Sequence, residues 1–487
     1  MSSLAVVPRP VEKLLPLERL EALCDPGTLR LQRTGIISPR LGERARPGDG
    51  ILAGTGRVNG RPVACYAQDV SLLGGSLGAN QAQTIVQILR LAGRARIPVI
   101  GFIESGGARL QEGLEALDGY GAIFREHVAL SGRVPQISVM CGTSAGGGCY
   151  GPALTDFVVM TKESAMFLTG PGVVREVTGE DVTLDELGGP AVHERTGVCH
   201  AVAPTEADAA ILTRELLSYL PDRAGASPSS RDPEEPLLDD PGAPVPSNGR
   251  QVYDMRMVVR ALVDRGALLE IQSRWARNML IGFARVEGRS VGIVANQPRY
   301  LGGILDAEAA QKAARFIRTC NLFGIPLLVL VDTPGFLPGT GQERGAVIRH
   351  GAKLVHAFAE ATVPSVTVVL RKAFGGAYIT MNSRELGADM VLAWPGAELG
   401  VMGAPQAVGV VNRRDLAASA DPERLRARLA DSYAEEHLTT AGAAAGGHID
   451  EVIHPSESRD RIADAFEVFA HVDHDAANGI IGRNLPL

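Results

Sequence analysis

The chain has 487 residues, 45% of them hydrophobic and 21% charged, so it is long enough for two domains and too apolar to be mainly disordered. Its net charge of −7 gives no broad basic surface for nucleic acid or an anionic membrane. The six cysteines contain no C-x-x-C pair, which disfavours a zinc ribbon or a disulfide scaffold and suits a reducing cytoplasm.

The N-terminal 20 residues and the apolar runs give no sign of export or membrane insertion. Three prolines and several charges interrupt residues 1–20, a pattern unlike that of a signal peptide. Apolar runs such as Leu327–Val331 are far shorter than the roughly 20 residues that span a bilayer. We therefore expect a cytoplasmic protein with neither a membrane nor a nucleic acid as partner.

Strands and helices are expected to alternate along the chain. Short β-branched runs predict strands, and stretches with apolar residues three and four apart predict helices. Alternation of this kind implies an α/β fold with helices packed on a mostly parallel sheet. In chain order, the expected elements are a helix over Ala79–Ala92, strands over Val99–Ile103, Ile137–Met140 and Phe157–Met160, a helix over Ala307–Cys320, and strands over Leu327–Val331, Ser365–Leu370 and Met390–Ala393.

The two halves of the chain repeat each other. The run RVNGRPV at Arg57–Val63 returns as RVEGRSV at Arg285–Val291, and LGGSLGA at Leu73–Ala79 returns as LGGILDA at Leu301–Ala307, both 228 positions later. Landmarks in the same order at a nearly constant offset indicate a duplication. Residues 221–250 are dense in Pro, Ser, Gly and Asp and predict a linker, so we expect domains at 1–220 and 251–487.

A turn of small residues follows a predicted strand in each half. The first turn is Gly146-Gly147-Gly148 and the second is Gly375-Gly376-Ala377. Such turns leave consecutive N–H groups bare, and these groups can converge on one oxygen and stabilise a developing oxyanion. Two copies suit a reaction with two enolate-like intermediates. Close packing of a helix against the sheet is the alternative explanation.

A second pair of turns follows the preceding strand. SGGARLQEG at 105–113 and DTPGFLPG at 332–339 occupy equivalent places. Tight turns with left-handed glycines explain them as well as a backbone approached by a ligand does. The D-x-x-G run within the second resembles a GTPase element, but the chain lacks the G-x-x-x-x-G-K-[ST] loop that GTPase chemistry requires.

Ser144 lies in a G-x-S-x-G run, as the nucleophile of a serine hydrolase does. The position 229 residues later is Ala373, while the neighbouring glycines persist, so a nucleophilic serine is the less favoured hypothesis. His and carboxylate residues show no metal-ligand spacing. Several cations near the second turn fit either an exposed helix face or contact with a phosphate: Arg349, Lys353, Arg371 and Lys372.

These motifs together resemble the carboxyltransferase (β) subunit of biotin-dependent acyl-CoA carboxylases, of the acetyl-/propionyl-CoA carboxylase β type found in actinobacteria. The resemblance covers about residues 15–487 and implies two duplicated crotonase-like domains and a homohexamer. The runs that carry it are SGGARLQEG (105–113), AGGGCYGPA (145–153), DTPGFLPG (332–339), RHGAK (349–353), EATVP (360–364) and RKAFGGAY (371–378).

The resemblance also implies the reaction. A carboxyl group passes from N-carboxybiotin to the α-carbon of a short-chain acyl-CoA, which gives malonyl-CoA or methylmalonyl-CoA. Biotin acts as the base, so the protein needs no tuned acid–base pair. No lysine lies in a Met-Lys-Met biotinylation motif, so biotin is expected on a partner, the biotin carboxylase/biotin carboxyl carrier α subunit.

By the same resemblance, Gly147 and Gly148 hold the thioester oxygen, and Gly376 and Ala377 hold the ureido oxygen. Ile379 stands where some relatives have Asp, which suggests acetyl-CoA use, with or without propionyl-CoA. A biotin-dependent decarboxylase subunit and a non-catalytic scaffold are the remaining alternatives. The other residues expected to bind substrate are Gly146, Gly106, Gly107, Ala108, Arg109, Gly375, Tyr378 and Lys353.

Overall fold

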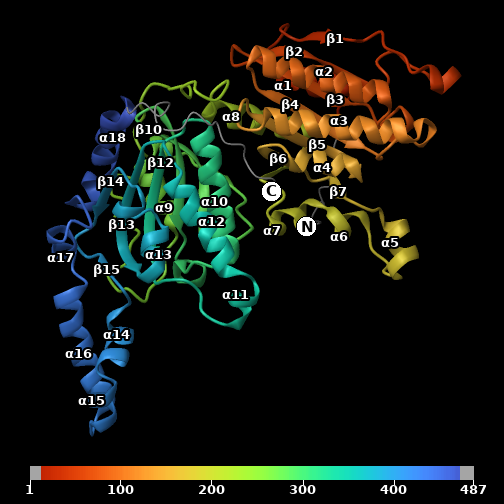
Figure 1. Cartoon of the computed structure of the whole chain (residues 1–487). Coiled ribbons are helices and arrows are strands. Elements are labelled where there is room, and N and C mark those ends of the chain that lie inside the picture. The colour runs from red at the N-terminus through yellow and green to blue at the C-terminus, as the bar shows by residue number, and fades with distance from the viewer. Residues whose placement is uncertain (1–12, 472–487) are drawn as a thin grey trace, which may run out of the picture. The chain divides into compact units, whose positions relative to one another are not determined.

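Each half of the chain folds around its own sheet in the computed structural model, which describes residues 13–471 (Figure 1). The chain divides into two units between Ser218 and Tyr219. The expectation of no signal peptide falls partly on residues 1–12, which lie outside the described residues. The domain limits at 220 and 250 stay predictions. Residues 221–250 contain no helix or strand, and the Arg231 N–H donates to the Gly288 carbonyl (3.0 Å) in the second unit.

The sheet of the first unit has the order β1-β2-β3-β4-β5-β6-β8, and β7 pairs with the end of β5. Strands β1 to β3 are antiparallel, and β3 to β8 are parallel. All seven residues of β4 are buried, as expected of a central parallel strand. The strands are β1 (Arg30–Gln32), β2 (Ile51–Val58), β3 (Arg61–Gln68), β4 (Val99–Ser105), β5 (Gln136–Ala145), β6 (Phe157–Thr161), β7 (Ala165–Phe167) and β8 (Ala201–Ala203).

Helix α2 packs on this sheet through the apolar stripe that the sequence predicts. Its buried residues Ile85, Ile88, Leu89 and Ala92 recur three and four apart, and they join a core with the strands. Helix α3 packs beside α2. The helices of this unit are α1 (Pro16–Leu23), α2 (Ala79–Ala95), α3 (Leu114–Leu130), α4 (Gly147–Ala153), α5 (Pro171–Thr178), α6 (Leu184–Gly188), α7 (Pro190–Thr196) and α8 (Glu206–Tyr219).

The second unit repeats this arrangement strand for strand, so the duplication is confirmed. Its order is β16-β14-β13-β12-β11-β10-β9, and β15 pairs with the end of β13 as β7 pairs with β5. Each expected strand and helix is present at its predicted place. The strands are β9 (Leu269–Ile271), β10 (Met279–Val286), β11 (Arg289–Asn296), β12 (Leu327–Thr333), β13 (Ser365–Phe374), β14 (Met390–Ala393), β15 (Glu398–Gly400) and β16 (Glu451–Val452).

The two units differ most in the helices that follow β7 and β15. In the second unit α14 to α16 project from the sheet (Figure 1) and have a small apolar cluster that includes Val408, Leu416 and Leu438. The helices are α9 (Met255–Leu262), α10 (Ala307–Leu322), α11 (Thr340–Arg344), α12 (Val347–Ala359), α13 (Gly375–Thr380), α14 (Ala404–Val411), α15 (Arg413–Ala418), α16 (Pro422–His437), α17 (Thr440–Ala445) and α18 (Ser458–Val468).

Candidate active-site turns

The first glycine turn stands at the carboxyl end of β5. Strands β4 and β5 run parallel, and after a shift in register Ser105 pairs with Ser144. The segments that follow both strands therefore leave the same edge of the sheet. The carboxyl ends of parallel strands are where α/β folds place their ligands, so this edge is the natural place for a site.

Gly146 turns the chain out of β5 into α4. Its φ of 59° and ψ of −124° lie where side chains with a Cβ are rarely found. Its N–H donates to the Phe167 carbonyl (3.1 Å). Gly147 and Gly148 are the first two residues of α4, and helix geometry gives their N–H groups no partner within the helix. Gly147 is partly exposed, whereas Gly148 is buried.

The second unit builds the same turn at the end of β13. There Thr333 of β12 pairs with Ala373 after the equivalent register shift, and Gly375 has a φ of 60°. Gly376 and Ala377 are the second and third residues of α13, so their N–H groups also lack a partner within the helix. Each unit thus presents two consecutive N–H groups, an arrangement that can stabilise an anionic oxygen.

Ser144 is not equipped as a nucleophile. Its side chain is completely buried, and its Oγ has no hydrogen-bond partner. A serine nucleophile requires a base within hydrogen-bond reach. The structure therefore argues against the serine-hydrolase hypothesis.

The turn at Gly106–Ala108 uses its backbone within the fold. The Gly106 N–H donates to the Gly74 carbonyl (2.9 Å), and the Gly107 N–H donates to Ser105 Oγ (3.3 Å). Ala108 bridges to Leu77. The N–H groups of Gly106 and Gly107 are thus engaged within the fold, and the assignment of Gly106, Gly107 and Ala108 to substrate binding stays a prediction.

The guanidinium of Arg109 lies in the interior of the first unit, and its assignment as a substrate-binding residue stays a prediction. It forms ion pairs with Asp49 and Glu112, both at 2.8 Å, and its side chain is fully excluded from solvent. Burial raises the pKa of Asp49 even though the Arg109 charge opposes that shift. A guanidinium held between two buried carboxylates is a structural group.

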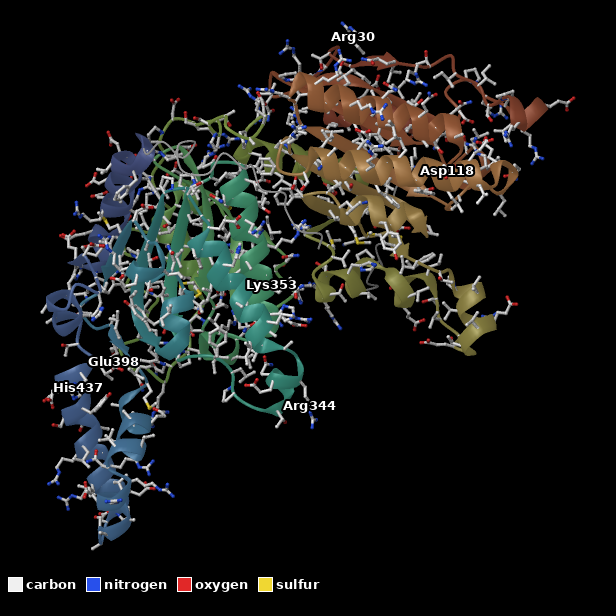
Figure 2. The ribbon with its side chains drawn as sticks, in the orientation of Figure 1. Arg30, Asp118, Arg344, Lys353, Glu398 and His437 are labelled. Atoms are coloured by element: carbon white, nitrogen blue, oxygen red, sulfur yellow. The ribbon has the colours of Figure 1, made fainter. Side chains whose placement is uncertain are left out.

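The other expected residues of the second unit lie on or near its turn. Ile379, two residues after Ala377, is 50% exposed, so it can meet a ligand. The Tyr378 hydroxyl donates to the His448 carbonyl (3.4 Å), and burial raises the pKa of that phenol. Lys353 is exposed on α12, as Figure 2 shows.

Of the expected cations, Arg371 is buried. Its Nε donates to Asp332 Oδ2 (3.1 Å), and its guanidinium lies over the Tyr253 ring. Burial raises the pKa of Asp332, and the positive charge of Arg371 works against that shift. Arg371 therefore holds the end of β12 rather than a phosphate.

Sequence reasoning missed Tyr120, which packs beneath the first turn. A Cβ built on Gly147 would lie 2.7 Å from Tyr120 Cγ. No motif marks this tyrosine, because it lies in the middle of α3, 27 residues before the glycine that it contacts. Its position within an amphipathic helix predicts only burial.

Within residues 13–471, no group of three His, Cys, Asp or Glu side chains is placed to hold a metal ion. No helix in the same range is long and apolar enough to cross a membrane. The six cysteines are all free and buried.

Comparison with known proteins gives the same family along nearly the whole chain. The carboxyl transferase domain family matches residues 9–477. The chain is 48% identical over 474 residues to the propionyl-CoA carboxylase beta chain of Saccharopolyspora erythraea, covering 93% of this chain and 87% of that one. It is 45% identical over 476 residues to a biotin-dependent acetyl-/propionyl-coenzyme A carboxylase beta5 subunit of Mycobacterium tuberculosis, covering 94% and 87%.

A solved structure agrees with these relatives. The hexameric transcarboxylase 12S, crystallised with methylmalonyl-coenzyme A, superposes with a TM-score of 0.90 at 45% identity, covering 94% of this chain and 89% of that one. Its likeness confirms the expected pair of duplicated crotonase-like domains.

Proposed function

Since this chain belongs to the carboxyl transferase family, we propose that its two glycine turns are the two oxyanion sites of a biotin-dependent acyl-CoA carboxyltransferase. The chain is an enzyme whose reaction is carboxyl transfer between biotin and an acyl-CoA. The observation that carries the assignment of the sites is the repetition of one backbone geometry, with Gly146 at φ 59° and Gly375 at φ 60°, each followed by two bare N–H groups.

The first turn receives the acyl-CoA. The N–H groups of Gly147 and Gly148 donate to the thioester oxygen, and they donate more strongly as negative charge collects there on loss of the α-proton. Such interactions lower the barrier because they are stronger in the transition state than in the ground state. The donors are fixed by the backbone and need not reorganise during the reaction.

The second turn receives biotin. When bound, N-carboxybiotin would supply the carboxyl group as CO2, and the ureido anion left behind would take the α-proton. The residues fit this group, because helix geometry leaves the Gly376 and Ala377 N–H groups without a partner within α13, and Gly376 is exposed on the turn although Ala377 is buried. These donors would make the ureido oxygen a weaker base, so their role is to balance its charge while the carboxyl group leaves.

Partners follow from the same chemistry. The chain carries no biotinylation motif, so biotin is brought by an α subunit with biotin carboxylase and carrier functions. We propose a homohexamer, the assembly named for the transcarboxylase 12S relative. The six free, buried cysteines suit the cytoplasm.

The test is reconstitution of the full chain with candidate α subunits, ATP, bicarbonate and acetyl-, propionyl- or butyryl-CoA. We expect carboxylated CoA only when the chain, the α subunit and ATP are all present. If no α subunit supports carboxylation while malonyl- or methylmalonyl-CoA still loses CO2 to a biotin carrier, the decarboxylase alternative replaces this proposal.

Acyl-chain choice is assigned to Ile379. Because its side chain is half exposed, Ile379→Asp should change stability by no more than about 0.5 kcal/mol, so that kinetic changes report on binding. We expect the ratio of kcat/KM for acetyl-CoA to that for propionyl-CoA to change in this variant. An identical ratio in the wild type and the variant would remove Ile379 from substrate choice.

A further inference from the structure

The Tyr120 ring supports the first glycine turn directly. Tyr120 is 7% exposed, and a Cβ on Gly147 would lie 2.7 Å from its Cγ and 2.8 Å from its Cδ1 and Cδ2. Contacts under 3.0 Å are not found between real atoms of this kind, so the α-carbon of Gly147 rests on the ring. Only glycine permits this approach.

The Tyr120 hydroxyl extends this support to the neighbouring turn. It lies 3.3 Å from Ser105 Oγ, and Ser105 Oγ also accepts the Gly107 N–H at 3.3 Å. Ser105 pairs with Ser144 at the ends of β4 and β5. One side chain thus connects α3, the Gly107 turn and the turn that bears the bare N–H groups.

The second unit supports its turn differently. The positions 228 and 229 residues after Tyr120 are Ile348 and Arg349, and both side chains are exposed. The nearest atom to a Cβ built on Gly376 is Phe336 Cδ2, at 3.9 Å. The second turn is therefore less tightly packed, and close contact with an aromatic ring occurs only at the first of the two turns.

We infer that Tyr120 is a positioning residue for the acyl-CoA reaction: through Gly147 it aims the N–H groups of the first turn at the thioester oxygen. This inference rests on the proposed function. Its physical basis is that donors act only when fixed at the oxygen, and a misplacement of about 1 Å can cost about 10²-fold in rate. The hydroxyl adds a smaller share, because it is one hydrogen bond at long distance.

The experiment uses the full chain reconstituted with its α subunit and compares Tyr120→Leu, Tyr120→Phe and the wild type. Tyr66→Phe is the matched control, because Tyr66 is also a buried tyrosine of the first unit, 3% exposed, but packs on Gly101 in the sheet. Each variant is assayed for kcat and for KM toward acetyl-CoA and the biotin carrier. Binding of acetyl-CoA is compared with binding of S-ethyl-CoA, a thioether that lacks the carbonyl oxygen.

We expect Tyr120→Leu to lower kcat/KM for acetyl-CoA by about 10²-fold and to leave the KM for the carrier unchanged. In the same variant, the preference for binding acetyl-CoA over S-ethyl-CoA should also fall. Tyr120→Phe should lose about 2- to 10-fold, as one hydrogen bond allows. Tyr66→Phe should keep both the rate and the preference.

Two failures can be told apart. If the wild type binds thioester and thioether equally, the oxyanion assignment of the proposed function is wrong, and the role of Tyr120 is wrong with it. If the wild type prefers the thioester and the Tyr120 variants keep that preference, Tyr120 only fills the core. Should Tyr120→Leu not fold, the decision rests on Tyr120→Phe: a loss of about 2- to 10-fold, with none in Tyr66→Phe, supports the role, and no loss overturns it.

Discussion

The two glycine turns have the same backbone and different surroundings. Gly146 and Gly375 differ by 1° in φ, and both follow a strand whose register shifts at the same place. Beneath the first turn lies Tyr120, whereas the second turn has more open space. The two copies therefore share the backbone geometry of the turn and differ in the side chains beneath it. This is expected, because the backbone, not the side chains, presents the N–H groups.

The ends of β4 and β12 also share one feature between the two units and differ in what surrounds it. Glu104 and Asp332 stand 228 positions apart, and both are buried carboxylates paired with an arginine. Glu104 pairs with Arg19 of α1 and with Lys13, whereas Asp332 pairs with Arg371 of β13. A buried carboxylate needs a counter-charge, but the element that supplies it is free to differ.

The largest effect that separates the two units is expected from Arg109→Leu, because the second unit has Leu337 at the equivalent position. Removal of the guanidinium leaves Asp49 and Glu112 buried without their partner, which should cost about 3–5 kcal/mol in the free energy of unfolding. Denaturant unfolding measures this. The control is Arg40→Ala, which breaks an exposed ion pair with Glu115 and should cost less than about 1 kcal/mol.

The folded fraction of Arg109→Leu should keep the wild-type KM for acyl-CoA. A normal unfolding free energy together with a raised KM would return Arg109 to the substrate site.

The next largest effect comes from adding a methyl group to each glycine turn and comparing the loss of kcat. Gly147→Ala places a methyl group against the Tyr120 ring, so the N–H groups must move, and kcat should fall by about 10²–10³-fold. Gly376→Ala meets Phe336 only at 3.9 Å and should lose less than about 10-fold. Steady-state rates of the reconstituted enzyme measure both. Equal losses would mean that the space beneath the turns does not matter.

A smaller effect is expected from Lys353→Ala on α12. This exposed cation has no buried partner, and contact with a phosphate of the acyl-CoA would contribute about 1 kcal/mol or less, which is a rise in KM of up to about 5-fold. The difference should shrink in high salt, because exposed charges are screened. A KM that is unchanged at low salt would place the phosphates elsewhere.

The smallest effect is expected from Ser144→Ala, which gives the first unit the residue that the second unit has at Ala373. The Ser144 Oγ is buried without a hydrogen-bond partner, so its removal should leave the rate within about 2-fold and the stability equal or slightly higher. Loss of activity in this variant would instead support the hypothesis that Ser144 is a nucleophile.

The fold could be predicted from the sequence because short local motifs, repeated in both halves, indicate the strands, the helices and the duplication. Runs such as Val99–Ile103 and Leu327–Val331 are apolar enough to be buried on both faces, and they are central parallel strands. The glycine turns were also predictable, since a residue with φ near +60° after a strand favours glycine. In the structure, both turns directly follow a strand, as the sequence predicted.

Other features depend on contacts between distant residues and left no local signal. Arg109 lies in a glycine-rich motif that suggests a ligand, but its partner Asp49 is 60 residues away, so its burial was not foreseeable. The contact of Tyr120 with Gly147 likewise arises only when α3 packs against α4. Motifs identify a backbone that can bind; packing decides which side chains serve the fold.

The most direct measurement is a structure of the assembled enzyme with an acyl-CoA and biotin both bound. We expect the thioester oxygen within about 3.1 Å of the Gly147 and Gly148 nitrogens, and the ureido oxygen equally close to those of Gly376 and Ala377. Either oxygen lying away from its turn, or an ionisable side chain of the protein poised at the α-carbon, would contradict the account.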